Sequence, residues 1–286
     1  MVGALDIGGT HVTAGRVRLS VATVEPGSRV RVAYTTGGAP LLERILDAAR
    51  SVATAETDRF GVAAPGPFDY AAGVCLVSHK LAGLYGVNLR REFALALGLD
   101  GAAISFVNDA EAFLLGEWWA GAARGHARAI GVTLGAGLGS AFLASGRIVR
   151  TAPGVPAEGE LYRLSFRGAP VEETISRRAL LARYGTDPDT GPDVQQIAER
   201  ARAGERRARL VFEELGADLA EFLRPRLEAF TPTCLVVGGS IAHAWKLLEP
   251  ALTPAFAGDR CLVVTRAARI DDAPLLGGAR HAAAQA

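Results

Sequence analysis

Two stretches of the chain repeat one design, and this repetition constrains the fold more than any other feature. The first, MVGALDIGGTHVTAGRV at the start of the chain, is typical of a strand, a turn at Gly8 and Gly9, and a second strand that begins near His11. The second, IGVTLGAGLGSAFLASGRIV (residues 130–149), again has an apolar strand, a glycine-rich turn and another apolar strand. Two such hairpins about 125 residues apart predict two similar lobes that face a shared phosphate.

Glycine suits these turns because it lets backbone N–H groups approach an anion closely, and Thr10 adds a hydroxyl donor. By itself the first hairpin is equally consistent with an ordinary turn. A third glycine turn, in CLVVGGSIAHAW (residues 234–245), follows an apolar strand and opens a helix, whose N-terminus could meet a nucleotide. Three such turns in a chain of alternating strands and helices favour a phosphate-binding α/β protein.

Between the first two hairpins, ISFVNDAEAFLLGEWWAG indicates a strand that ends at Val107 and then a helix. Asp109 therefore lies where a strand meets a helix. Two interpretations stay open: an N-cap, worth about 1 kcal/mol, or a general base near the phosphate turns.

Composition excludes several classes of partner. The 286 residues allow one large domain or two ordinary ones, and the repeated hairpins favour two. Lys plus Arg (31) nearly balance Asp plus Glu (30), so the net charge of +1 creates no general attraction to nucleic acid or membranes. Cys75, Cys234 and Cys261 are too far apart in sequence for a CxxC metal pair and argue against a disulfide framework. Without a signal segment or a long apolar run, we expect a soluble cytoplasmic protein.

Six motifs occur in a specific order along nearly the whole chain: DIGGTHVTAG (6–15), GVAAPGPFD (61–69), NDAEAFLLGE (108–117), LGAGLGSAF (134–142), VVGGSI (236–241) and DDAPLLGGARHA (271–282). In this ordered set the chain resembles the ROK family (repressor, open reading frame, kinase), whose kinases act on sugars. The resemblance implies an α/β chain with the two-lobed actin-like (ribonuclease H-like) ATPase fold and an interlobe cleft. We expect a small N-terminal α/β lobe over residues 1–107 and a larger C-terminal lobe over residues 108–273. A helix within residues 274–286 is expected to pack back on the first lobe.

The resemblance also implies the nucleotide contacts. They are a first phosphate loop at Asp6, Gly8, Gly9, Thr10 and His11, a second at Gly135, Gly137 and Gly139, and Gly238 with Gly239 against the adenosine. Asp6 would lie near Mg²⁺ and the transferred phosphoryl group, with ATP as co-substrate. Such a site suits phosphoryl transfer, which needs in-line positioning and charge neutralisation more than covalent help.

On the acceptor side, the resemblance makes Asp109 the general base for the attacking hydroxyl. Asn108 would hydrogen-bond sugar hydroxyls, and Gly66 would also lie at the substrate. Lys80, in VSHKLAGLYGVNL, stands near a position where the family often has a sugar-contacting asparagine. Lys80 either contacts an acidic or modified substrate or is a solvated loop lysine.

The segment AEGELYRL (residues 157–164) departs from the family pattern. Relatives have Gly-Glu-x-Gly-His there, followed by a cysteine-rich motif, and the histidine and cysteines bind a structural zinc. Here Glu160 matches the sugar-binding glutamate and Glu172 the last glutamate of the zinc motif, but Arg163 replaces the histidine and the following residues contain no cysteine. Arginine stays protonated and cannot bind zinc, so we expect no structural zinc. Arg163 either hydrogen-bonds a substrate or pairs with Glu158, Glu160 or Glu172; we favour the pairing.

Two further departures affect the phosphate loops: Ala136 replaces a usual threonine, and His11 replaces a usual lysine. The prediction is nevertheless a kinase that transfers the γ-phosphate of ATP to a hydroxyl of a hexose-like sugar or a cyclitol, working as a homodimer. The alternatives are a kinase that uses polyphosphate and a catalytically weak sugar sensor of the family without a DNA-binding domain.

Overall fold

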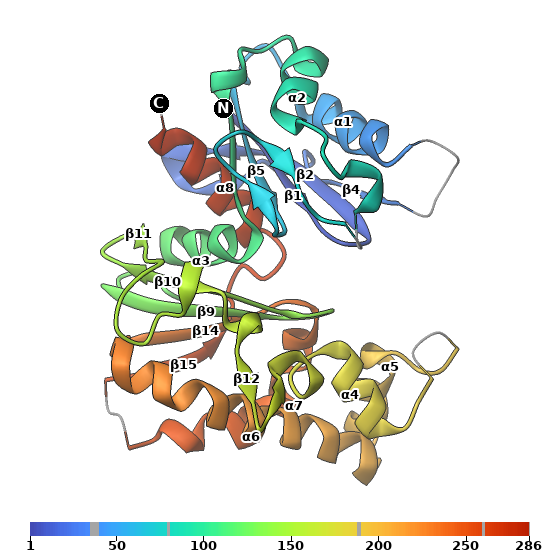
Figure 1. Cartoon of the computed structure of the whole chain (residues 1–286), viewed down its shortest axis with the longest axis vertical. Coiled ribbons are helices and arrows are strands. Elements are labelled where there is room, and N and C mark those ends of the chain that lie inside the picture. The colour runs from blue at the N-terminus through green and yellow to red at the C-terminus, as the bar shows by residue number, and fades with distance from the viewer. Residues whose placement is uncertain (35–39, 79–80, 188–189, 259–260, 286) are drawn as a thin grey trace. The chain divides into compact units, whose positions relative to one another are not determined.

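The computed structural model describes residues 1–34, 40–78, 81–187, 190–258 and 261–285. The chain divides into two compact units. Unit 1 comprises Met1–Arg124 and Arg269–Ala286, and unit 2 comprises Gly125–Ala268. The first unit is therefore built from both ends of the chain (Figure 1).

Unit 1 is centred on a six-stranded sheet with the order β3-β2-β1-β5-β8, in which β4 also pairs with β2. The strands are β1 (Val2–Ile7), β2 (His11–Arg18), β3 (Thr23–Val24), β4 (Val30–Ala33), β5 (Arg59–Ala64) and β8 (Ile104–Asn108). Strands β1, β5 and β8 are parallel, whereas β2 runs antiparallel to β1, β3 and β4. A separate small ladder joins β6 (Phe68–Asp69) and β7 (Val74–Cys75).

Helices cover both faces of this sheet, so its central strands are almost continuously apolar. The helices of unit 1 are α1 (Leu41–Val52), α2 (Leu89–Leu97), α3 (Asp109–Ala120) and α8 (Ala273–Ala284). Leu5 and Ile7 pack in the large cluster that includes α1 and α2. Val2 and Ala4, which point to the opposite face, pack with Leu275 of α8.

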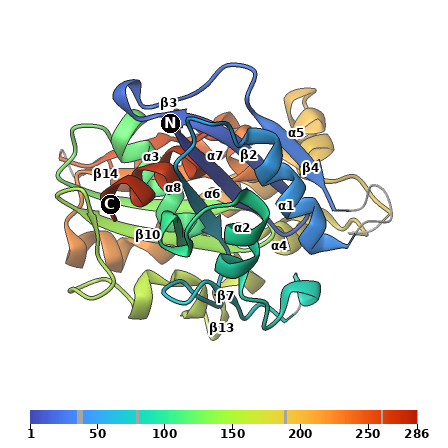
Figure 2. The same cartoon turned by 90° about the horizontal axis from the view of Figure 1, so that it is seen from above.

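Glycines let α8 approach its neighbours at the backbone. A Cβ on Gly277 would lie 1.7 Å from the carbonyl oxygen of Ala112 in α3, and one on Gly116 would lie 2.0 Å from that of Ala273. Larger residues at these two positions would force the helices apart. Helices α3 and α8 consequently lie side by side in both views (Figures 1 and 2).

Unit 2 has a five-stranded sheet with the order β11-β10-β9-β14-β15. Its strands are β9 (Arg128–Leu134), β10 (Leu138–Ala144), β11 (Arg147–Ile148), β14 (Cys234–Gly238) and β15 (Val263–Arg266). Its helices are α4 (Arg177–Tyr184), α5 (Val194–Arg202), α6 (Arg206–Phe230) and α7 (Trp245–Leu252). A small hairpin, β12 (Ser165–Phe166) and β13 (Ala169–Pro170), lies between β11 and α4 in sequence.

The observed units differ in their boundaries from the lobes expected at residues 1–107 and 108–273. The first unit extends to Arg124 because α3 packs closely against α8, which also belongs to that unit. In unit 2, α6 continues through Pro225.

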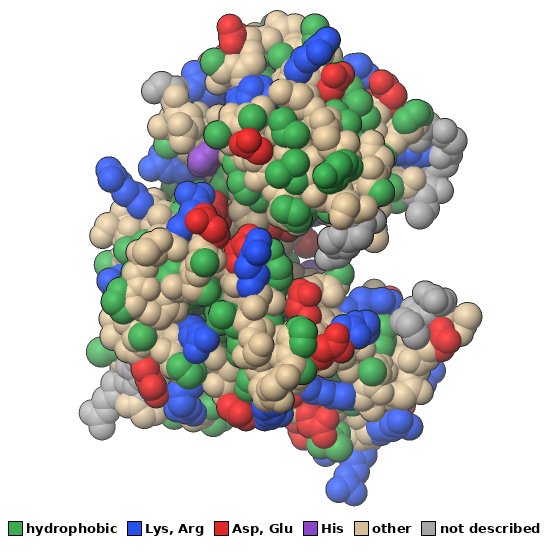
Figure 3. Space-filling view, in the orientation of Figure 1, with side chains coloured by type: hydrophobic (Ala, Val, Ile, Leu, Met, Phe, Trp, Pro, Cys, Tyr) green, Lys and Arg blue, Asp and Glu red, His purple; other side chains and the backbone are tan. Residues whose placement is uncertain are grey.

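Short 3-10 helices complete the described chain: Leu19–Val21, Ala82–Leu84, Gly101–Ala103, Ala157–Gly159, Leu161–Arg163, Val171–Glu173, Ser240–Ala244 and Pro254–Phe256. No helix among the described residues is long and apolar enough to cross a membrane. On the face of unit 2 seen in Figure 3, basic and acidic side chains are interspersed, in keeping with the net charge of +1.

Candidate functional site

Two carboxylates lie at the same edge of the unit 1 sheet. Asp6, near the end of β1, is in register with Ala63 of β5, which is in register with Val107 of β8. Asp109 follows directly after β8, so both aspartates lie at the carboxyl ends of parallel strands. Ligands of open α/β sheets typically bind at this edge.

The two carboxylates influence each other electrostatically. The pKa of Asp6 is raised to about 7, first by burial and then by the charge of Asp109, against the opposing effect of Arg29 and Arg31. Neighbouring carboxylates in such surroundings hold a proton or a cation between them. Oxygen ligands of this kind suit Mg²⁺, so these residues fit the cation that a nucleotide would bring.

Helix α3 is capped by Asn108, which corrects the interpretation of Asp109 as the N-cap. The Oδ1 atom of Asn108 accepts hydrogen bonds from the N–H groups of Ala110 (2.9 Å) and Glu111 (3.3 Å). Asp109 is the first residue of the helix, and its own Oδ1 accepts from the N–H of Ala110 at 2.8 Å. The capping role therefore does not require the Asp109 carboxylate.

The other end of the Asn108 amide is also held. Its Nδ2 donates to the hydroxyl of Tyr70 at 3.1 Å, and that hydroxyl donates to the carbonyl of Ala64 at 3.2 Å. These contacts fix the orientation of the amide beside Asp109. Gly66 lies in the loop that follows β5, next to Pro67.

The first glycine turn is a tight connection between β1 and β2. The N–H of Gly8 donates to the carbonyl of His11 at 2.9 Å, and the carbonyl of Thr10 accepts from the N–H of Tyr34 at 3.0 Å. Gly9 and Thr10 are exposed at its tip. The turn is thus ordered by β2 and β4 while its tip stays accessible to a ligand.

Sequence reasoning missed the cation beside this turn. The Nη2 atom of Arg31, in β4, lies 3.4 Å from Nδ1 of His11. Because a guanidinium only donates, Nδ1 of His11 is unprotonated in this contact. Burial and then the charges of Arg31 and Arg29 lower the pKa of His11, so Arg31 carries the positive charge there at neutral pH. The alternation in SRVRVAY suggests a strand, but only the pairing with β2 brings it to the turn.

The second glycine turn, between β9 and β10, is braced by Glu172. The N–H of Gly135 donates to the carbonyl of Gly137 at 3.0 Å. The carboxylate Oε1 of Glu172 accepts from the N–H of Leu138 at 2.8 Å, and a Cβ on Gly137 would lie 2.2 Å from that oxygen. A side chain at position 137 would therefore displace the carboxylate that supports the turn.

The third glycine turn adjoins the second within unit 2. Strand β14 ends at Gly238, which is in register with Thr133 of β9. Gly239 has a φ of +80°, and a Cβ there would lie 2.4 Å from the carbonyl oxygen of Leu134. Gly139 lies in β10, just after the second turn. The predicted phosphate and adenosine residues of unit 2 are thus gathered at one edge of its sheet.

The loop with Glu160 is fastened to β10. The hydroxyl of Ser140 donates to the carbonyl of Gly159 at 2.6 Å and accepts from the N–H of Leu161 at 2.9 Å. Arg163 forms an ion pair with Glu160, which was the interpretation that we favoured. In the described ranges, no group of three or more His, Cys, Asp or Glu side chains is arranged to hold a metal ion.

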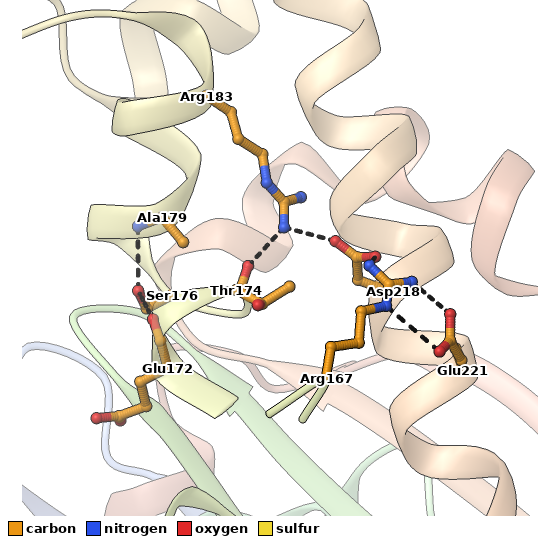
Figure 4. A network of polar contacts seen from close by, with 8 residues as sticks. All are labelled: Arg167, Glu172, Thr174, Ser176, Ala179, Arg183, Asp218 and Glu221. Atoms are coloured by element: carbon orange, nitrogen blue, oxygen red, sulfur yellow. Dashed lines mark hydrogen bonds and ion pairs between the residues drawn. The ribbon is translucent and has the colours of Figure 1, made fainter. Parts of the chain in front are cut away.

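A polar network fastens the segment that follows this loop (Figure 4). Arg167, in the turn of the β12–β13 hairpin, donates to Asp218 of α6 at 2.7 Å and also pairs with Glu221. Arg183 of α4 donates to the other oxygen of Asp218 at 2.5 Å and to the carbonyl of Thr174 at 3.0 Å. The buried Asp218 carboxylate thereby joins the hairpin, α4 and the stretch just after Glu172.

The predicted site residues divide between the units. Unit 1 holds Asp6, Gly8, Gly9, Thr10, His11, Gly66, Asn108 and Asp109, and unit 2 holds Gly135, Gly137, Gly139, Glu160, Arg163, Glu172, Gly238 and Gly239. Lys80 lies outside the described residues.

Comparison with known proteins identifies relatives that match nearly the whole chain. The model of the ROK family matches residues 2–284. The chain is 26% identical to a glucokinase of Thermotoga maritima, over 96% of this chain and 95% of that enzyme. The ROK hexokinase of Thermus thermophilus superposes with a TM-score of 0.73 at 26% identity, covering 97% of this chain and 96% of that one. A ROK family glucokinase of Streptomyces griseus, solved with glucose and AMPPNP, gives a TM-score of 0.79 at 24% identity, covering 99% of each chain.

Proposed function

Because the chain belongs to the ROK family and has the fold of its kinases, we propose that it transfers the γ-phosphate of ATP to a hydroxyl of a sugar or cyclitol. The observation that carries the proposal is the pair of carboxylates, Asp6 and Asp109, beside the glycine turn between β1 and β2. The glucokinase and hexokinase relatives support a sugar-like acceptor and ATP as donor.

In this proposal Asp109 is the general base. It takes the proton from the acceptor hydroxyl as that oxygen attacks the γ-phosphorus. A base positioned in this way contributes about 10² to 10⁴ in rate. The rigid cap at Asn108 supports the assignment because it fixes the backbone from which the Asp109 side chain projects.

Asp6 would hold Mg²⁺, either directly or through water. When bound, the ion neutralises charge on the donor's phosphates. The glycine turns would supply backbone N–H donors to phosphate: Gly8, Gly9 and Thr10 in unit 1, and Gly135 with Gly137 in unit 2. Gly238 and Gly239 would lie against the adenosine.

Asn108, Gly66, Glu160 and Glu172 are the proposed acceptor contacts. The geometry sharpens two of these roles. One oxygen of Glu172 already accepts from Leu138, so Glu172 would position the second phosphate turn as well as reach a substrate. Arg163 pairs with Glu160, so it would orient that carboxylate. We extend the acceptor class to cyclitols because this loop departs from the family pattern.

The test is ATP turnover screened across hexoses, N-acetylated hexosamines and cyclitols with Mg²⁺ present. We expect one class to stimulate ADP release at least 100-fold over the rate without acceptor, in the range that positioned acid–base groups contribute. Sugar binding by calorimetry without any stimulated turnover would instead support the sensor alternative, which Ala136 and His11 favour. A parallel screen with inorganic polyphosphate in place of ATP tests polyphosphate as the alternative phosphoryl donor.

The proposal includes a homodimer that binds neither nucleic acid nor membranes, in keeping with the balanced charge. Light scattering at micromolar concentration tests the assembly. A monomer that turns over at full rate would contradict that part alone.

A further inference from the structure

Strand β4 places a cation on the same face of the sheet as Asp6. Cross-strand partners in a ladder point to the same face, and Asp6 is the partner of Thr13 in β2, which is the partner of Arg31 in β4. Neighbouring strands lie about 4.8 Å apart. Arg31 thus starts two strands from Asp6, and its long side chain reaches His11 at the glycine turn.

Arg31 is exposed and forms no ion pair with any residue that the structure describes. Its neighbour Arg29 differs, because it lies 3.8 Å from the Asp272 carboxylate and donates to the carbonyl of Asp271. Arg29 therefore ties β4 to the start of α8. Arg31 instead contacts an imidazole that bears no positive charge in this contact, so its charge is available to an anion.

We propose that Arg31 is a donor-binding residue that contacts the terminal phosphate of the phosphoryl donor at the β1–β2 turn. A guanidinium binds phosphate through paired N–H donors, whereas a lysine offers a single charged point. Arg31 thereby supplies the positive charge that His11 lacks. The inference rests on the proposed kinase activity. It adds to that activity a residue that binds the charged terminal phosphate of the donor.

Terminal phosphate occurs both in a nucleoside triphosphate and in inorganic polyphosphate. The variants are Arg31→Ala, Arg31→Lys, and Arg31→Ala combined with His11→Lys. Arg91→Ala is the matched control, because Arg91 is also an exposed arginine of unit 1 and forms no ion pair among the described residues. Thermal unfolding of each variant confirms that it is folded.

The first measurement is binding by calorimetry of ATP, ADP and tripolyphosphate to the full chain, without acceptor. We expect Arg31→Ala to weaken the binding of ATP and of tripolyphosphate about 10- to 100-fold, as for a lost charge-assisted contact. The binding of ADP should weaken much less. Placing a lysine at position 11 should restore at least part of the loss, because its ammonium would lie where Arg31 now reaches. A loss of affinity for ATP alone identifies the nucleotide as the phosphoryl donor. A loss of affinity for tripolyphosphate alone identifies polyphosphate as the donor.

The second measurement is steady-state turnover with the acceptor found by the screen. The KM for the donor should rise in Arg31→Ala while the KM for the acceptor stays within about twofold, as expected for lost donor binding. Equal losses for ATP and ADP, an equal loss in Arg91→Ala, or unchanged donor binding would each overturn the proposal. If the wild-type chain binds these phosphates without turnover, the kinase function fails and the binding comparison still decides the role of Arg31. If it binds none of them, both proposals fail.

Discussion

At the scale of single residues, the carboxyl edge of the unit 1 sheet concentrates the chemistry. Asp6 and Asp109 repel each other, Asn108 caps α3, and Arg31 lies against His11. The backbone of Asp6, Asn108 and Asp109 lies at the end of a buried strand or at the start of a helix. Small changes at these positions should therefore alter chemistry without unfolding the unit.

The role of Asp109 is tested by Asp109→Ala and Asp109→Asn. We expect either change to lower kcat by about 10² to 10⁴, while ATP and acceptor binding change less than about fivefold. Asp47→Ala, on the exposed face of α1, should leave kcat unchanged. A kcat within a factor of three of wild type in Asp109→Ala would refute the assignment.

The raised pKa of Asp6 predicts a dependence of stability on pH in the absence of Mg²⁺. Its folded pKa, about 7, lies above the usual value of 3.8, so the folded state binds the proton more tightly. The resulting stability is present below about pH 4 and is lost as pH rises through 7. Asp6→Asn should match wild type at pH 4 and exceed it at pH 8 by about 4 kcal/mol.

Urea unfolding at pH values from 4 to 8 measures this difference. Asp109→Asn should give a smaller gain with the same sign, because it removes only one cause of the shift. A free energy of unfolding for Asp6→Asn that runs parallel to wild type at every pH would contradict the prediction.

At the scale of elements, unit 2 uses side chains to hold its loops to the sheet. Glu172 braces the turn between β9 and β10, Ser140 fastens the Glu160 loop, and Asp218 joins the β12–β13 hairpin to α4 and α6. These contacts are polar, partly buried and non-local. Each can be removed separately, so their contributions to binding and to stability are separable.

The brace at the second turn is tested by Gly137→Ala. The added Cβ would lie 2.2 Å from Oε1 of Glu172 and should displace that carboxylate from Leu138. We expect nucleotide affinity to fall about tenfold, the equivalent of one lost hydrogen bond to a charged group. Gly258→Ala is the control, because a Cβ there meets nothing within 4 Å. The nucleotide affinity of Glu172→Gln should lie between those of Gly137→Ala and Gly258→Ala, because the glutamine side-chain oxygen can still accept the hydrogen bond from Leu138.

The network at Asp218 is tested by Asp218→Ala. Removing this buried carboxylate leaves Arg167 and Arg183 without their shared partner and should lower the free energy of unfolding by about 2–3 kcal/mol. The exposed partner Glu221 provides the matched comparison, for which Glu221→Ala should cost less than about 1 kcal/mol. Equal losses in urea unfolding would show that burial of Asp218 does not matter.

At the scale of the whole molecule, both ends of the chain build unit 1, and the middle builds unit 2. Residues from both units match the family's site motifs. The segment in which we expect no structural zinc contains the Arg163–Glu160 pair, and Arg167 and Arg183, which follow it, both pair with Asp218 of α6. Removal of metal ions should therefore stop catalysis without lowering the stability of the protein.

Treatment with EDTA separates these two effects. We expect chelation to abolish turnover, which added Mg²⁺ restores, and to leave the midpoint of thermal unfolding within about 1 °C. The expectation for unfolding follows because protein ion pairs, unlike a structural zinc site, do not depend on a bound metal. A fall of several degrees that zinc reverses would show that a structural zinc is present after all.

The sequence by itself determined the family, the fold class and the positions of the three glycine turns. It also located Asp109 at the junction of a strand and a helix. These features are local, because glycine spacing and apolar runs bias the backbone over a few residues. The family model and the related structures confirm the family and the actin-like fold.

Only the tertiary structure decided which side chains meet. It assigned the helix cap to Asn108 in place of Asp109, grouped α3 with α8, and brought Arg31 to the first turn and Glu172 to the second. Arg31 is 20 residues from His11 in sequence, and Glu172 is 34 from Leu138. Such contacts depend on strand register and helix packing, which are set by the burial of the whole unit and leave no local signal in residue spacing.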